Sequence, residues 1–449
     1  MAEKKYDLTT GNILSKLLLV AMPIMGTQFL QMTYNLVDMF YLGRVGSDAV
    51  AASSTAGTYM WLASGLMLLG RMGAEIGVSQ ALGRRDEEDA QRYARGALAI
   101  ATVLGIAFAL VMVLFRGPLT GFFKLEAGVA RNAERYLAIV GVAVPFTYVS
   151  AVINGIFTAS GNSRIPFLAN AAGLALNMLL DPLLIFGLKM NVVGAAVATA
   201  SAQMFVTLIL ALALFRSKRR PFETFALFRR LSAAHVRRMV SWSLPISLES
   251  LCFTLLSMLT TRIVSAYGTG ALATLQVGNQ IESLSWLVAG GYGSAVTAFV
   301  GQNYGARQQH RIDQCVRMSM SVMVVWGMIV SLVLFFFGGA LFMVFLPERE
   351  LLPLGIQYLR ILSVCEIAVC IENVGSAAFR GSGQTRQSAI ASISSNCLRV
   401  VLAYVLSKTP MGIYGVFVAV TFATIVRGGS IVLWYYKTRR RFDCVPAEG

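Results

Sequence analysis

The feature that most constrains this chain is a series of twelve long apolar runs separated by short polar breaks. Several runs exceed the ~20 residues that an α-helix needs to cross a bilayer. Because the hydrocarbon core offers backbone groups no hydrogen-bond partner, such runs must form helices. We therefore predict an all-α integral membrane protein with twelve transmembrane helices. The expected spans are 15–42, 50–82, 94–115, 132–157, 166–187, 192–215, 241–265, 270–304, 316–345, 352–379, 387–408 and 412–436.

The composition agrees with a chain embedded in lipid. Hydrophobic residues make up 56% and charged residues only 13%, which is about half the charged share of a soluble protein. These values exclude a disordered chain, a coiled coil and an ordinary cytosolic enzyme. The formal net charge of +16 could indicate nucleic-acid binding, but the Lys and Arg residues lie mostly in short loops between apolar runs. We expect the lipid bilayer as a partner and no nucleic acid.

The distribution of basic residues predicts the orientation in the membrane. With the N-terminus inside, the tails and the even-numbered loops hold most of the 38 Lys and Arg residues. The positive-inside rule then places both termini in the cytoplasm. We expect a multi-pass protein of the inner, cytoplasmic membrane.

Cysteine and histidine residues give no sign of a metal site or an enzyme. The six cysteines lie in the second half, mostly in apolar runs, without the spacing of a zinc site or a disulfide framework. His235 and His310 fall in polar loops. The sequence holds no P-loop pattern and no grouping of nucleophile and base, so ATP-driven transport and a membrane-embedded enzyme are disfavoured. We expect no cofactor and no enzymatic activity.

The two halves of the chain repeat each other with an offset of 222 residues, which slips by one residue near the end. The matched pairs include Pro23 with Pro245, Gly46 with Gly268, Arg85 with Arg307, Gly161 with Gly383, and Gly194 with Gly415. Because each copy holds an even number of spans, both copies enter the membrane in the same direction. This predicts two six-helix lobes related by a pseudo-two-fold axis along the membrane normal, which favours a carrier over a channel. The expected domains are an N-terminal lobe (1–215), a basic cytoplasmic linker (216–240), a C-terminal lobe (241–437) and a cytoplasmic tail (438–449).

Polar residues in the first span form a stripe that points to ion coupling. Gln28, Gln31, Asn35 and Asp38 are spaced by three, four and three residues, so they share one helix face. An ionisable side chain at membrane depth costs about 2.5–3.5 kcal/mol on insertion scales and indicates function. We interpret Asp38 as a coupling acid and the three amides as a polar stripe along a cavity. Hydrogen bonding to a neighbouring helix is the alternative.

The fifth span adds a second polar group. Asn177 and Asp181 are four residues apart on one face, and Pro182 removes the helical partner of the Met178 carbonyl. A carboxylate, an amide oxygen and a free carbonyl suit a hard cation, so Na⁺ is possible at Asp38, Asn177 and Asp181. The alternative is that Asp181 lies near the outer end of its span and meets water.

The repeat predicts that such a site belongs to the first lobe. The offset places Asp38 opposite Thr260, Asn177 opposite Arg399 and Asp181 opposite Ala403. The second lobe has thus lost both acids and gained a cation. A possible second-lobe site remains open at Glu249, Glu282, Glu366, Glu372 and Arg399. Arg399 could pair with Glu372 across helices, and a structural ion pair and a second coupling site are equally consistent with the sequence.

Three motifs resemble the multidrug and toxic compound extrusion (MATE) family: 37–46 (VDMFYLGRVG), 300–306 (VGQNYGA) and 379–386 (FRGSGQTR). The segment from Asn177 to Pro182 is similar to the prokaryotic, DinF-like branch. That resemblance implies a proton or cation site in the first lobe and a hinge in the first helix at Pro23. The coupling residues that it implies are Asp38, Asn154, Asn177, Asp181 and Thr199. The NorM-like branch carries one acid in the seventh span and an aspartate in the tenth span. The matching positions in this sequence are Phe253 and Val369, which are not acidic.

The resemblance implies an ion-coupled multidrug efflux antiporter that works by alternating access. It would export amphipathic, often cationic, organic compounds in exchange for H⁺ or Na⁺, and it would act as a monomer. Burial favours the protonated form of a carboxyl group, so capture of a proton near neutral pH is physically reasonable. The alternative is a lipid or lipid-linked precursor flippase of the same superfamily, for which Arg399 is the first hint.

Overall fold

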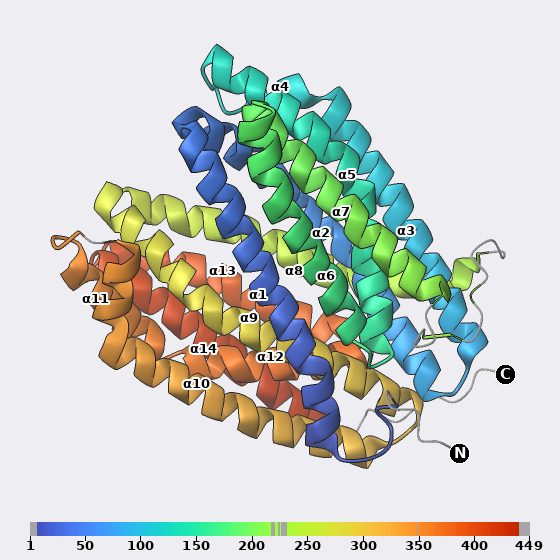
Figure 1. The fold of residues 1–449 in the computed structure, drawn as a ribbon. Coiled ribbons are helices and arrows are strands. Elements are labelled where there is room, and N and C mark those ends of the chain that lie inside the picture. The colour runs from blue at the N-terminus through green and yellow to red at the C-terminus, as the bar shows by residue number, and fades with distance from the viewer. Residues whose placement is uncertain (1–6, 217–220, 223–224, 226–230, 347, 440–449) are drawn as a thin grey trace. The chain divides into compact units, whose positions relative to one another are not determined.

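The computed structural model describes residues 7–216, 221–222, 225, 231–346 and 348–439. All of the regular secondary structure in those ranges is helical (Figure 1). In the first half the helices are α1 (Ile13–Val45), α2 (Ser47–Gly83), α3 (Glu87–Leu114), α4 (Arg116–Gly121), α5 (Ala127–Ala159), α6 (Arg164–Pro182), the π-helix η1 (Leu183–Gly187) and α7 (Asn191–Arg216). In the second half they are α8 (Ala233–Ser265), α9 (Thr269–Gly305), α10 (Gln309–Phe345), α11 (Leu352–Ser363), α12 (Glu366–Gly381), α13 (Thr385–Ser407) and α14 (Ile413–Thr438).

Each expected span lies on one helix or on two consecutive helices, and the all-α membrane fold is confirmed. Within the described ranges, ten helices are long and apolar enough to cross a membrane, and α11 with α12 makes an eleventh candidate. The remaining span is α2, which has 37 residues but is less apolar than the other spans. The sequence did not predict the short helix α4 or the π-helix η1. His235 and His310, expected in loops, lie in the first turns of α8 and α10.

The tenth span differs from the single helix expected over 352–379, because α11 and α12 meet at an angle of 45°. At the break, the Ser331 hydroxyl of α10 donates to the Ser363 carbonyl at 2.6 Å. The Cys365 thiol donates to the Leu362 carbonyl at 3.1 Å. These side chains satisfy carbonyl groups at the end of α11, so the helix can stop there without leaving them unpaired.

The chain divides into two compact units. Unit 1 contains Met1–Thr10 and Leu18–Ser247, and unit 2 contains Gly11–Leu17 and Leu248–Gly449. Of the three divisions, one lies just before α1, and the other two fall inside α1 and α8. Within unit 1, α5 packs against α2, α3 and α7; within unit 2, α12 packs against α9, α10 and α14. The expected linker is only partly described, and the expected tail lies outside the described residues from 440 onward.

The backbone confirms the internal repeat. Residues that the offset pairs adopt the same uncommon positive φ angles: 140° and 101° at Gly46 and Gly268, 61° and 58° at Arg85 and Arg307, 81° and 77° at Gly161 and Gly383. The residue after each arginine also closes the same helix-terminal hydrogen bond, from Asp86 N–H to the Ala81 carbonyl and from Gln308 N–H to the Asn303 carbonyl. Equivalent turns therefore end equivalent helices in the two halves.

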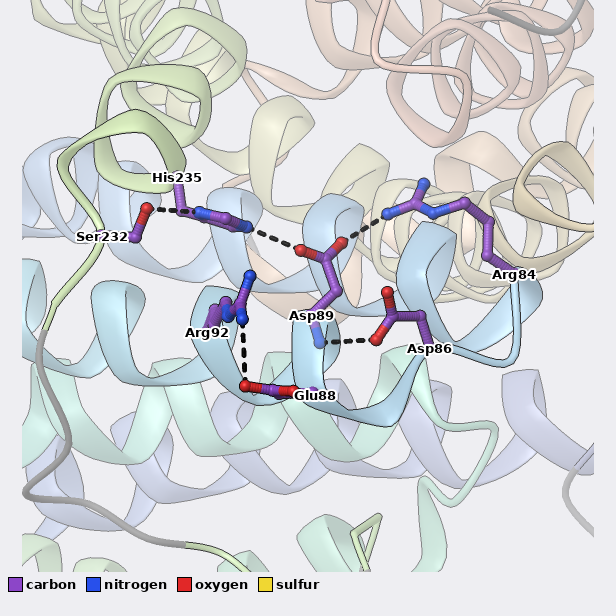
Figure 2. Close-up of polar contacts among 7 residues, drawn as sticks. All are labelled: Arg84, Asp86, Glu88, Asp89, Arg92, Ser232 and His235. Carbon is purple, nitrogen blue, oxygen red and sulfur yellow. Dashed lines mark hydrogen bonds and ion pairs between the residues drawn. The ribbon is translucent and has the colours of Figure 1, made fainter. Parts of the chain in front are cut away.

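The start of α8 is held onto α3 within unit 1 by a polar cluster (Figure 2). His235 Nε2 lies 2.6 Å from Asp89 Oδ1, and His235 Nδ1 lies 2.7 Å from the Ser232 hydroxyl. Arg84 donates to the other Asp89 oxygen at 2.6 Å. Asp86 caps α3 by accepting from the Asp89 N–H at 2.9 Å. These contacts explain why the beginning of α8 groups with the first half of the chain.

Candidate functional site

Unit 1 contains a cavity of about 550 Å³, which is within the usual range for small-molecule sites. Its wall comes from α1, α2, α5, α6 and α7. The apolar part includes Met39, Met60, Trp61 and Met67. The polar part includes Gln31, Tyr34, Asn35, Asp38, Arg71, Asn154, Asn170, Thr199 and Gln203. Such a wall can accept an amphipathic molecule, because apolar area and polar groups face the same space.

The polar stripe of α1 faces this cavity for most of its length. Gln31, Asn35 and Asp38 line it, as the helical spacing predicted. Gln28, one turn earlier, is half-buried and is not part of the wall.

Asn177 and Asp181 lie behind the cavity wall on α6. Both residues are 0% exposed, so Asp181 does not meet water at the outer end of its helix. The Asn177 amide Nδ2 donates to Asp181 Oδ1 at 3.3 Å. Asp181 is close enough to Asp38 for the two carboxylates to interact electrostatically. The acids of α1 and α6 therefore converge, although only Asp38 reaches the cavity surface.

Six buried oxygens at this place have no hydrogen-bond partner in the described part of the chain. They are Asp38 Oδ1, Asn154 Oδ1, Asn177 Oδ1, Asp181 Oδ2 and the hydroxyl oxygens of Tyr34 and Thr199. A buried acceptor without a partner costs about 1–3 kcal/mol, so the arrangement is suited to a bound proton or cation. Because the donors are all oxygens, a hard cation fits them better than a transition metal. Among the described residues, no group of three or more His, Cys, Asp or Glu side chains could hold a metal ion, and this site has only two acids.

Two tyrosines that the sequence analysis missed complete the surroundings. Tyr34 and Tyr136 line the cavity and interact electrostatically with both Asp38 and Asp181, and both lie beside Thr199. Tyr34 is four residues before Asp38, so the helical spacing could have revealed it. Tyr136 comes from α5, and no spacing links it to α1 or α6.

The segment of α1 around Pro23 is tied to the start of α6. Helix α1 continues through Pro23 without interruption. The Ser163 hydroxyl donates to the Val20 carbonyl at 2.7 Å, one residue after the Leu19 carbonyl whose helical partner Pro23 removes. A Cβ atom on Gly26 would lie 2.7 Å from the Phe167 ring, so α1 approaches α6 closely here.

The acids of unit 2 have other partners than the sequence suggested. Glu372 lies 3.4 Å from Arg427 of α14 and accepts from the Ser376 hydroxyl at 2.9 Å. Arg399 instead donates to the Ser257 hydroxyl at 2.8 Å and stacks over the Phe253 ring. The expected pairing of Arg399 with Glu372 is therefore wrong, because α12 packs directly on α14 while Arg399 faces α8.

The other three acids of the predicted second-lobe site fall into two groups. Glu249 lies 3.9 Å from Arg380. Glu366 is 0% exposed and accepts from the Ser285 hydroxyl at 2.8 Å, while its second oxygen is unpartnered in the described ranges. Glu282, on the same helix as Ser285, interacts electrostatically with Glu366.

Comparison with known proteins agrees with this architecture. The MatE family profile matches residues 23–183 and again residues 245–405. The "Probable multidrug resistance protein NorM" of Thermotoga maritima is 23% identical over 432 residues, covering 94% of this chain and 92% of that protein. The "Probable multidrug resistance protein YoeA" of Bacillus subtilis is 26% identical over 427 residues, covering 93% and 91%.

A solved structure gives the same fold. It is described as the "Outward-facing conformation of a multidrug resistance MATE family transporter of the MOP superfamily", with a TM-score of 0.92, 22% identity, and coverage of 98% of this chain and 99% of that chain. The two profile matches together span well over half of the sequence. This chain is therefore a multi-pass membrane transporter of the MatE family.

Proposed function

We propose that this protein is a secondary active efflux antiporter, which exports amphipathic, often cationic, organic compounds in exchange for H⁺ or Na⁺. The observation that carries the proposal is the group of buried, unpartnered oxygens beside a cavity of substrate size in unit 1. The multidrug resistance names of the relatives support export as the direction of transport.

In this mechanism Asp38 and Asp181 hold the coupling ion, and Asn154, Asn177 and Thr199 complete its surroundings. Asp38 also lines the cavity, so ion and substrate compete for the same carboxylate. A ligand shifts a conformational equilibrium only by its different affinity for the two states. Competition at Asp38 supplies that difference, and Pro23 gives α1 a weak point at which to bend.

We further propose membership of the DinF-like branch. Two features support it: the paired Asn177 and Asp181 lie close to Asp38, and Phe253 occupies the α8 position where the NorM-like branch carries an acid. By the same reasoning, coupling belongs to unit 1, and the acids of unit 2 have at most a supporting role. We expect a monomer in the inner membrane with both termini in the cytoplasm.

We favour drug efflux over a lipid flippase. The residue that hinted at a flippase was Arg399, an unexplained cation in the second lobe. Its guanidinium is engaged by Ser257 and by the Phe253 ring. A structural role thus explains Arg399 without a lipid headgroup.

The test is ion-coupled efflux by purified protein in proteoliposomes, with pH and Na⁺ gradients imposed separately on vesicles that contain ethidium. The gradient that drives efflux in the unmodified protein identifies the coupling ion. Asp38→Asn preserves size and removes the charge. Because coupling free energies commonly correspond to about 5–150-fold, we expect gradient-driven efflux to fall by about tenfold or more.

The matched control is Asp48→Asn, which changes an exposed acid at the start of α2 that does not line the cavity. It should keep normal efflux. Gradient-driven efflux at the unmodified rate in Asp38→Asn, with normal folding by size-exclusion chromatography, would remove Asp38 from the mechanism and overturn the proposal.

A further inference from the structure

The cavity of unit 1 carries a positive charge that ion coupling leaves unused. Arg71 of α2 lines the cavity together with Asn154 and Asp38. Its Nε atom is buried and has no hydrogen-bond partner, and Arg71 forms no ion pair within the described ranges. The acid one turn along α2, Glu75, is fully buried and does not belong to the cavity wall.

Arg71 is partly buried, and its buried Nε atom has no partner, which is a costly arrangement for a charged group in a cavity wall. Arg427 and Arg399 also have an unpartnered Nε atom, but another nitrogen of each guanidinium has a contact: Arg427 lies 3.4 Å from Glu372, and Arg399 donates to Ser257. Arg71 has neither kind of contact within the described ranges, and it lines the cavity of unit 1.

The internal repeat shows that the fold does not require Arg71. The equivalent position in the second half, 222 residues later, is Gly293. A Cβ atom on Gly155 of α5 would lie 3.0 Å from the Arg71 carbonyl oxygen and 3.4 Å from its Cγ, which is tighter than an ordinary contact. In the second half that partner is Ala377, which stands near Gly293. The larger residue of the pair is thus on α2 in the first half and on α12 in the second half, and the Arg71 side chain passes Gly155 in van der Waals contact.

We propose that Arg71 is an anion-binding subsite for the transported compound and that cargo of this protein includes amphipathic molecules with a free carboxylate. The planar guanidinium presents paired N–H donors that match a carboxylate. The methionine and tryptophan side chains of the wall take the apolar body of the molecule. Asp38 lies on the same wall and suits a cationic group of the same molecule. A zwitterionic amphiphile therefore has a partner in the cavity for each of its two charges.

This inference rests on the proposed efflux function only in treating the bound compound as cargo. Its test is equilibrium binding without any gradient, so a failure of ion coupling would not affect the result. The probes are rhodamine B, which has a free carboxylate, and its ethyl ester, which shares the cationic ring system. Binding to purified protein in detergent is measured by fluorescence anisotropy.

We expect the unmodified protein to bind rhodamine B more tightly than the ester. Arg71→Gln should weaken rhodamine B binding by about tenfold or more, the scale of one charge-assisted hydrogen bond, and should leave ester binding within about twofold. Arg71→Lys should restore part of the difference, because it keeps the charge without the planar fork. The control Arg262→Gln changes an exposed arginine outside the cavity and should alter neither affinity.

Equal effects of Arg71→Gln on both dyes, or none on either, would overturn the proposal. It would also be wrong if dihexanoyl phosphatidic acid bound in an Arg71-dependent manner while rhodamine B did not. The subsite would then serve a lipid phosphate.

Discussion

Buried acids in unit 2 differ in what compensates for their burial. Glu372 has a cation at 3.4 Å, and the side chains of both partners are about one-tenth exposed or less (Arg427 11%, Glu372 9%). Glu366 is fully buried and has only the Ser285 hydroxyl as a hydrogen-bond donor among the described residues. An ion pair and a hydroxyl contact respond differently when the acid becomes an amide, since only the first leaves a charge behind.

Glu372→Gln should therefore destabilise the protein far more than Glu366→Gln. The first change leaves the Arg427 charge without its carboxylate partner and should lower the free energy of unfolding by about 3 kcal/mol. The second keeps an acceptor for Ser285 and should cost less than about 1 kcal/mol. The measurement is the thermal unfolding midpoint of each variant in the same detergent. A larger shift for Glu366→Gln would mean that this carboxylate is charged and balanced by a cation.

Spacing within one helix was enough to predict most of the first-lobe stripe, but it could not predict which residues of other helices lie beside a given side chain. Gln31, Asn35 and Asp38 share a face because the helical period requires it. Asn154 and Thr199 came only from family resemblance, since a lone polar residue in an apolar run carries no pattern. The partner of Arg399 could not be predicted, because it depends on which helices are neighbours.

At the scale of helices, close approach between α12 and α14 depends on one of two adjacent glycines. A Cβ atom on Gly428 would lie 2.6 Å from the Ala368 carbonyl oxygen, whereas one on Gly429 would meet nothing within 4 Å. The two positions differ by one residue in the same helix, so helix propensity acts on them equally.

Gly428→Ala should destabilise the protein by about 2 kcal/mol, because the backbone of α12 must move to make room. Gly429→Ala should be neutral or stabilise by up to about 1 kcal/mol, because alanine is the better helix former. Unfolding midpoints of the two variants provide the comparison. Equal destabilisation would show that α12 and α14 do not pack as closely as described.

Helix limits were largely predictable from the sequence, but the break between α11 and α12 was not. Its equivalent in the first half, α5, is continuous. At the break, the Ser331 hydroxyl of α10 donates to the last carbonyl of α11. The hydropathy of the α11–α12 segment carries no information about a hydrogen-bond donor that comes from another helix.

At the scale of the whole molecule, the basic residues predict that both termini face the cytoplasm. A green fluorescent protein fused after Gly449 should fluoresce, and alkaline phosphatase fused at the same point should be inactive, because only the cytoplasm permits the first result. The control is alkaline phosphatase fused after Lys124, in a predicted outer loop, which should be active. The opposite pattern would invert the topology and, with it, the direction of the proposed efflux.

The architecture of the whole chain was the most predictable level, because the repeat and the apolar runs extend through nearly all of it. The divisions between the units were not predictable, since the expected boundary was the polar linker. Two of them instead cut through helices, where the first turns of α8 are anchored by Asp89 and His235.

That placement has a mechanical consequence. The unit boundaries cross α1 after Leu17 and α8 after Ser247, and Pro23 and Pro245 each lie within two turns of a crossing. Any rotation between the units would bend both helices. The bending would fall close to the prolines, where one backbone hydrogen bond of the helix is already missing. Each helix would then bend most easily at its proline, so a rotation would need less force and the rest of the helix would stay rigid.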